Sequence, residues 1–71
     1  MNQTEQVLEY MRTNGSIDPL RAFNDLGILR LGARIWDIKA SGVPVTGEIK
    51  TNPDTGKHWK EYRLVQQERL A

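Results

Sequence analysis

Arg30 and Arg34 are spaced four residues apart and are the side chains in this sequence best suited to bind an anion. On a helix they would lie side by side as like charges that repel each other slightly, and an external anion between them would relieve that repulsion. A guanidinium group can bind a phosphate, or the O6/N7 edge of guanine, through two hydrogen bonds. Asp37 offers the alternative, because it could pair with Arg34 and leave both as ordinary surface charges.

Four basic side chains flank the turn-forming residues 52–56 and make a second candidate site for an anion: Lys50, Lys57, His58 and Lys60. If the turn is the tip of a hairpin, we expect them to come together there, where they could contact phosphates or reach a minor groove regardless of base sequence. Asp54 opposes them locally. The alternative is that the lysines only protect an exposed edge strand from pairing with another chain.

Two small residues and a tryptophan accompany the arginines. Gly32 and Ala33 would let a helix axis come close to a nucleic-acid groove or to a neighbouring helix. We expect Trp36 to pack inside the molecule against Val43, where it would cover the root of the hairpin. The alternative is an exposed Trp36 at an interface, stacked on a sugar or on a partner protein.

The inventory of reactive side chains argues against an enzyme. The sequence has no Gly-rich phosphate loop after a strand and no serine or cysteine nucleophile beside a base. With no cysteine and only one histidine, His58, it cannot build a thiolate or histidine metal site. We therefore expect no catalytic residue, no metal and no cofactor.

Three helices are predicted to position the arginines. The first covers about residues 4–13, with Asn2 or Thr4 as its cap and an exit at Asn14-Gly15, and residues 16–17 form a short extended connector. Asp18-Pro19 opens the second, in which Leu20, Phe23 and Leu26 recur at three-residue spacing before Gly27 stops it. The third begins near Leu29 and closes at Ser41-Gly42, with Leu31, Ile35 and Ile38 as its buried stripe.

A β-hairpin is predicted to follow the helices. Residues 43–51 and 57–65 alternate as strands do, and the loop between them has strong turn chemistry. Tyr62 and Leu64 should face the core, while Trp59, Glu61 and Arg63 face away. Residues 66–71 are predicted to be a flexible C-terminal tail, which leaves one domain at 1–65.

Composition and charge agree with a small globular module. The chain has 71 residues, of which 38% are hydrophobic and 27% charged. Its net charge of +1 is uneven: residues 1–27 carry two arginines against four acidic residues, and residues 28–65 carry seven basic against four acidic residues. This asymmetry points to nucleic acid, although an accidental imbalance on a solvated surface would look the same. The sequence predicts no membrane span and no secretory signal.

The helix-turn-helix segment also resembles a known family. The stretch 18–28 (DPLRAFNDLGI), followed by Arg30-Leu31 and Ala33-Arg34-Ile35, is similar to small phage and prophage helix-turn-helix proteins that end on a strand such as x-Y-R-L, here residues 61–64. The resemblance covers about residues 5–65 and departs at Phe23, where leucine is usual, at Trp36 and in the polar wing loop. It implies a winged helix-turn-helix fold, of class α+β, and DNA binding.

Two hypotheses about function follow. The first is a phage-type protein of the bacterial cytoplasm that binds double-stranded DNA, as a transcriptional regulator or a recombination accessory factor, with its third helix in the major groove and its hairpin on the backbone. So small a module makes few base contacts, so specific affinity would require a homodimer or tandem binding. The alternative is a winged-helix module that binds a protein partner, such as a phage inhibitor of a host nucleic-acid-processing complex. The weak net charge, Asp37 and an exposed Trp36 would favour that alternative.

Overall fold

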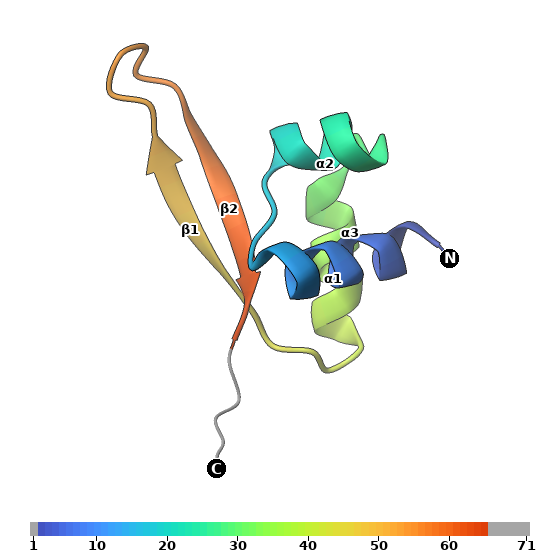
Figure 1. The fold of residues 1–71 in the computed structure, drawn as a ribbon. Helices are drawn as coiled ribbons and strands as arrows, with labels where there is room; N and C mark the ends of the chain where they lie inside the picture. Colours follow the sequence, from blue (N-terminus) through green and yellow to red (C-terminus); the bar gives the residue numbers. More distant parts are fainter. Residues whose placement is uncertain (1, 66–71) are drawn as a thin grey trace.

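Three helices followed by an antiparallel hairpin make up the protein (Figure 1). The computed structural model describes residues 2–65, and the predicted tail at 66–71 lies outside the described residues. The order of elements confirms the predicted α+β fold. No helix within residues 2–65 is long and apolar enough to cross a membrane. The elements are α1 (Gln3–Asn14), α2 (Pro19–Leu26), α3 (Leu31–Ala40), β1 (Val45–Thr51) and β2 (His58–Leu64).

Local signals fix both ends of α1. The Asn2 side chain accepts a hydrogen bond from the Glu5 backbone N–H at 2.8 Å, and the Glu5 carboxylate accepts one from the Asn2 N–H at 3.2 Å. This reciprocal pair is a capping box, which satisfies two of the N–H groups that a helix start leaves unpaired. At the other end Gly15 adopts a φ of 90°, and its N–H donates to the Met11 carbonyl.

Helix α2 begins and ends as the sequence predicts, but its apolar repeat does not mark its buried face. Asp18 caps it by accepting from the Arg21 N–H at 2.8 Å, and Gly27, at a φ of 70°, ends it. Ala22 is fully buried, whereas Leu20 and Phe23 are 68% and 53% exposed. Because α2 approaches its neighbours mainly through this small residue, Leu20 and Phe23 lie on the outside, and of the predicted repeat only Leu26 packs against the core.

The core lies between the helices and the root of the hairpin. The predicted stripe of α3 is confirmed, since Leu31, Ile35 and Ile38 are all at most 3% exposed. The remaining buried residues come from α1, from α2 and from the two connections that flank α2. Partly buried side chains of the hairpin root pack against this cluster from one side: Val43, Val45, Tyr62 and Leu64.

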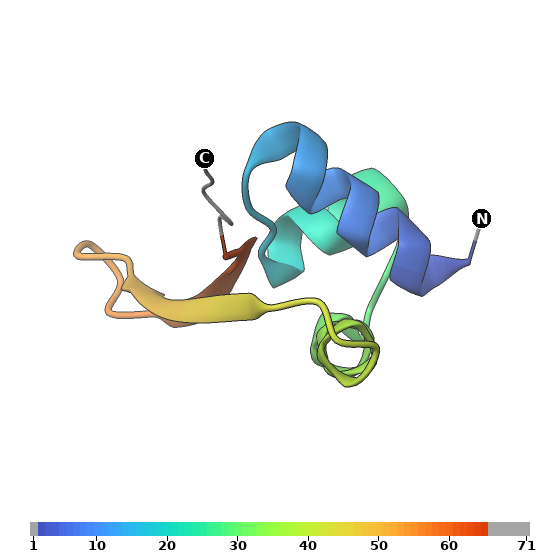
Figure 2. The same cartoon turned by 90° about the horizontal axis from the view of Figure 1, so that it is seen from below.

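The hairpin is tied to the helices through the connector between α1 and α2. Ile17 and Tyr62 exchange two backbone hydrogen bonds of 2.8 Å, so the predicted extended connector lies beside β2. Within the hairpin Gly47 faces Tyr62, and a Cβ on Gly47 would lie 2.7 Å from Lys60 Cε and 3.3 Å from the tyrosine ring. A larger residue at this position would therefore displace the end of the Lys60 side chain and crowd the ring of Tyr62. The outer half of the hairpin extends beyond the helices (Figure 2).

Candidate nucleic-acid interface

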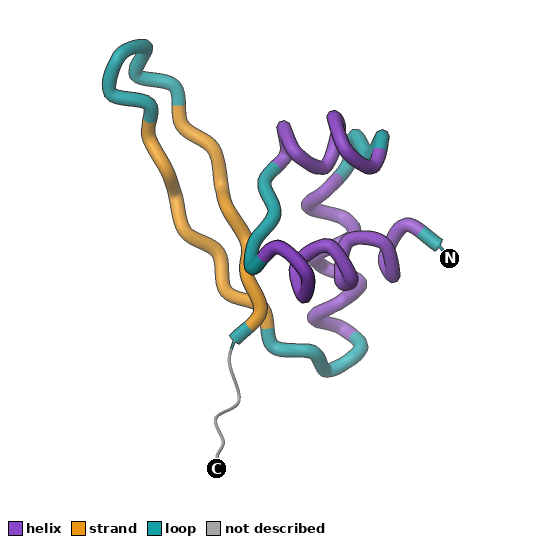
Figure 3. Tube along the Cα trace, in the orientation of Figure 1, coloured by secondary structure: helices purple, strands orange, loops and turns teal. Residues whose placement is uncertain are grey.

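Helix α3 begins two residues later than predicted, which changes how Arg30 is presented. The helix starts at Leu31, and Arg30 is its N-cap with φ −115° and ψ 64°. The Ile28 N–H bonds to the Ala22 carbonyl at 3.0 Å and the Ile28 side chain is buried, so residues 27–30 form a loop between α2 and α3 instead of the first turn of a helix (Figure 3). Leu29 is consequently 81% exposed. Arg30 and Arg34 are therefore not a side-by-side pair on one helical flank.

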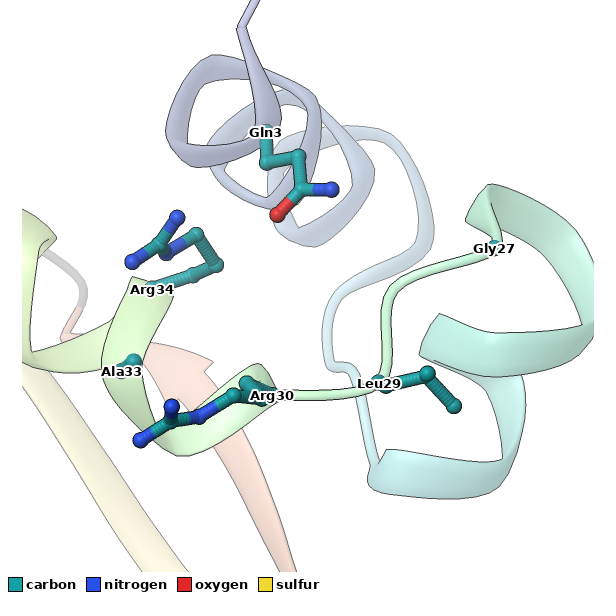
Figure 4. A pocket seen from close by; sticks show the side chains of 6 residues that line it. All are labelled: Gln3, Gly27, Leu29, Arg30, Ala33 and Arg34. Atoms are coloured by element: carbon teal, nitrogen blue, oxygen red, sulfur yellow. The ribbon is translucent and has the colours of Figure 1, made fainter.

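The two arginines line opposite parts of one open depression. It has a volume of about 390 Å³ and is bounded by the start of α1, the α2–α3 connection and the first turn of α3. The Arg34 guanidinium lies on the side of Gln3, and that of Arg30 lies on the other side of Ala33 (Figure 4). No side chain caps α3, and although the Ala33 N–H donates to the Arg30 carbonyl at 3.2 Å, the helix start keeps the partial positive charge of its N–H groups. The depression is therefore suited to an anion. Its lining residues are Gln3, Gly27, Leu29, Arg30, Ala33 and Arg34.

Arg34 is paired within the molecule, as the alternative reading proposed. Its Nε lies 3.3 Å from Asp37 Oδ2, and the two side chains are 32% and 40% exposed. The distance is that of an ion pair, but Nε lacks the geometry of a hydrogen bond. Asp37 also accepts a hydrogen bond from the Thr4 hydroxyl at 3.3 Å. This flank of α3 thus links the helix to the start of α1, and part of the Arg34 charge is already neutralised.

The outer hairpin gathers three of the four predicted basic side chains. Lys57, His58 and Lys60 are exposed, and the last two lie on one face of the hairpin. The expectation for Lys50 was wrong: it pairs across the strands with Trp59 and so lies on the opposite face, where it is bound to Glu48 at 3.3 Å and Glu61 at 3.8 Å. The alternation of strand side chains, which places neighbours on opposite faces, separates it from the others.

Trp36 does not pack inside the molecule, contrary to our expectation. It is 69% exposed. Successive residues of a helix are spaced about 100° apart around its axis, and this spacing places Trp36 on the side of α3 away from the buried stripe. The outward side of α3 carries Gly32, Ala33, Trp36 and Ala40, and it is flanked by the exposed Lys39 on one side and by Asp37 on the other.

Glu61 is the residue that sequence analysis missed. It does lie on the predicted face of β2, opposite Tyr62 and Leu64, but its side chain is only 17% exposed. Its carboxylate forms ion pairs with Arg21 of α2 and with Lys50 and Arg63 of the hairpin. Strand alternation marks such a position as solvent-facing, and only the Ile17–Tyr62 pairing, which brings α2 beside β2, reveals the contact.

Comparison with known proteins gives one finding about the whole fold. A family model described as "Winged helix-turn-helix domain" matches residues 2–67. No curated protein and no solved structure matches the chain. Within residues 2–65, no three histidine, cysteine, aspartate or glutamate side chains are placed to hold a metal ion.

Proposed function

This chain belongs to the winged helix-turn-helix domain family, and on that basis we propose that it binds double-stranded DNA, with α3 directed at the major groove and the hairpin as a wing on the sugar–phosphate backbone. Domains of this kind are typically DNA-binding and non-catalytic. One observation carries the proposal: the cations best placed on α3 and on the wing are exposed and make no ion pair with any residue in 2–65. They are Arg30 and Lys39 on α3, and Lys57 and Lys60 on the wing.

The two elements would make different kinds of contact. Arg30, at the uncapped start of α3, can donate two hydrogen bonds to guanine or to a phosphate. Lys57, His58 and Lys60 would contact phosphates, which gives affinity without base discrimination. Arg34 would contribute less than Arg30 because Asp37 neutralises it in part. Lys50, on the other face, would act only through its charge.

The outward side of α3 favours a particular kind of base readout. Gly32 and Ala33 have no hydrogen-bonding side-chain atoms, and the indole of Trp36 has a single donor. Apolar side chains in the major groove distinguish bases through the 5-methyl group of thymine. We therefore expect sites with thymine opposite Ala33 and Trp36.

The biological role that we propose is phage-type transcriptional regulation or assistance in recombination, in the cytoplasm of a bacterial host. With few side chains able to read bases, one copy would bind a site weakly, so we propose a homodimer or tandem copies on adjacent half-sites. Selection of bound duplexes from a random library tests this. Half-sites repeated at about one helical turn, 10–10.5 base pairs, would support paired binding.

Titration of a labelled duplex tests the DNA-binding proposal directly. Arg30→Ala should weaken binding by about 1–3 kcal/mol. Arg12→Ala is the matched control, since it removes the same charge from an exposed arginine. Arg12 lies in the last turn of α1, whereas the depression lies at the first turn of that helix. Affinity should also fall steeply as salt rises. An absence of binding at low salt would overturn the proposal.

A second candidate function is a protein-interaction module, such as a phage inhibitor of a host nucleic-acid-processing complex. The observation that favours it is the 69% exposure of Trp36, because tryptophan is enriched among the residues that contribute most to binding at protein interfaces. The same titration separates the candidates. A chain that binds no duplex at low salt, while Trp36→Ala leaves its fold intact, would fit this second function.

A further inference from the structure

We infer that Glu61 is a positioning residue that fixes the direction of the wing relative to the helices, and so determines where the wing cations meet DNA. The second half of this inference rests on the proposed DNA binding. The first half concerns the free protein and can be tested without DNA.

The two carboxylate oxygens of Glu61 serve different parts of the molecule. Oε2 faces the helices, with Arg21 Nη2 and Ser16 Oγ each at 3.4 Å. Oε1 faces the hairpin, with Arg63 Nη2 at 3.1 Å and Lys50 Nζ at 3.8 Å. One side chain therefore bridges the wing and the helices.

The partner on the helical side is itself held firmly. The Arg21 guanidinium lies 3.1 Å from Asp18, the N-cap of α2, and donates to Ser16 Oγ at 2.8 Å. It also lies 5.8 Å from the centroid of the Tyr10 ring, within range of a cation–π contact. Contacts in three directions leave Arg21 little freedom, so it gives Glu61 a fixed point of attachment on α2.

The wing needs such an attachment because little else holds its outer half. The backbone pairing of Ile17 with Tyr62 and the apolar packing of Val45 and Leu64 hold the root. Glu61 is one residue nearer the tip than Tyr62, and its contact with Arg21 is the only ion pair between a helix and the hairpin within residues 2–65. Beyond it the wing is a two-stranded ribbon, which is marginally stable and twists easily.

The directly opposed residue provides a matched control. Glu48 pairs with Glu61 across the strands and lies on the same face, but it is 63% exposed and its only ion pair within residues 2–65 is with Lys50. Replacing either glutamate by glutamine removes one negative charge from the same place. By charge alone, both replacements should strengthen binding to DNA. If Glu61 positions the wing, Glu61→Gln should instead weaken it.

The test compares the duplex affinity of the two variants at one salt concentration where urea denaturation shows both to be folded. Glu48→Gln should bind as tightly as wild type or slightly more tightly. Glu61→Gln should bind at least about fivefold more weakly, the lower end of typical coupling between sites. Glu61→Gln binding as tightly as wild type, or more tightly, would overturn the inference.

A second readout does not depend on DNA. In a Trp36→Phe background, Trp59 is the single tryptophan, and it lies two residues from Glu61 on the same face. Its fluorescence anisotropy should decay faster in Glu61→Gln, and also in Arg21→Gln, which breaks the pair from the other side, but not in Glu48→Gln. Unchanged decay in the first two variants would overturn the inference. Faster decay with no duplex binding by any variant would instead reject the proposed function.

Discussion

Helix α3 and the wing differ in how their charges are arranged. On α3, Arg34 is paired with Asp37, the cations Arg30 and Lys39, unpaired within residues 2–65, lie at the two ends, and the side between them carries small residues and Trp36. On the outer wing, Lys57, His58 and Lys60 are exposed, and none of them pairs with an acidic residue in the described part of the chain. The helix therefore offers an apolar surface between two cations, and the wing offers a cluster of basic side chains near its tip.

This difference shows how a chain with a net charge of only +1 can attract a polyanion. The acidic residues with close partners neutralise cations near the body of the protein, as Asp18 and Glu61 do with Arg21. The exposed cations that form no ion pair within residues 2–65 lie on the wing, as Lys57 and Lys60, and at the two ends of α3, as Arg30 and Lys39. Local charge rather than net charge is what a phosphate backbone meets within a Debye length of about 8–10 Å.

The largest expected effect separates the two regions by stability. Ile35→Ala in α3 should lower the free energy of unfolding by about 2–5 kcal/mol, because Ile35 is 3% exposed and its loss leaves a cavity. Ile49→Ala in the wing removes the same side chain from a position that is 61% exposed, and should change it by less than about 0.5 kcal/mol. Urea denaturation followed by circular dichroism measures both. Equal destabilisation would mean that the wing contributes to the core.

The next effect concerns the charge of the wing. The double variant Lys57→Gln/Lys60→Gln should reduce the slope of log affinity against log salt by about two, because each phosphate contact contributes about 0.9. Lys50→Gln is the control, since Lys50 is held by Glu48 and Glu61 on the other face. This replacement should change the slope by less than the value of about 0.9 that one phosphate contact contributes. Duplex titrations between 50 and 200 mM salt, a range chosen from typical salt dependence, measure the slopes. If Lys50→Gln reduced the slope more than the double variant, the face of the wing that carries Lys50 would be the one that contacts DNA.

A smaller effect tests the apolar character of α3. Replacing thymine by deoxyuridine in a selected site removes only the 5-methyl group, and each methyl in contact with α3 should contribute about 0.8 kcal/mol. Trp36→Ala should reduce the difference in binding free energy between thymine and deoxyuridine sites. A double-mutant cycle that combines this replacement with the base change measures the reduction. If uridine sites bind as well as thymine sites, α3 does not read methyl groups.

The smallest effect concerns Tyr10, whose ring lies beside Arg21, the helical partner of Glu61. The Tyr10 hydroxyl donates to Asp25 at 2.5 Å, and this hydrogen bond raises the pKa of Tyr10 above its usual 10.0. A pKa raised by folding gives stability that is present below pH 10 and is lost as the pH rises through the folded value. Urea midpoints measured across that range should fall for wild type and fall less for Tyr10→Phe. Equal pH dependence in both would show that other groups cause it.

Much of the fold is readable from the sequence because its signals are local. The capping box of Asn2 and Glu5, the Asp18-Pro19 start and the exits at Gly15 and Gly27 act over three or four residues. The stripe of α3 and the two faces of the hairpin follow from periodicity alone. The predicted start of α3 is two residues too early, because the burial of Ile28, which depends on tertiary packing, keeps residues 27–30 in a loop.

The sequence by itself determined three helices, a hairpin and the residues that could carry positive charge, because backbone geometry and the burial of apolar side chains depend on neighbours in the chain. Only the tertiary structure decided which charges remain available. Arg34 meets Asp37 on α3, whereas Lys50 and Arg21 converge on Glu61 from different elements. Ion pairs of the second kind join residues up to 40 positions apart. The partner of such a charge is therefore set by the packing of α2 against β2, which local periodicity does not encode.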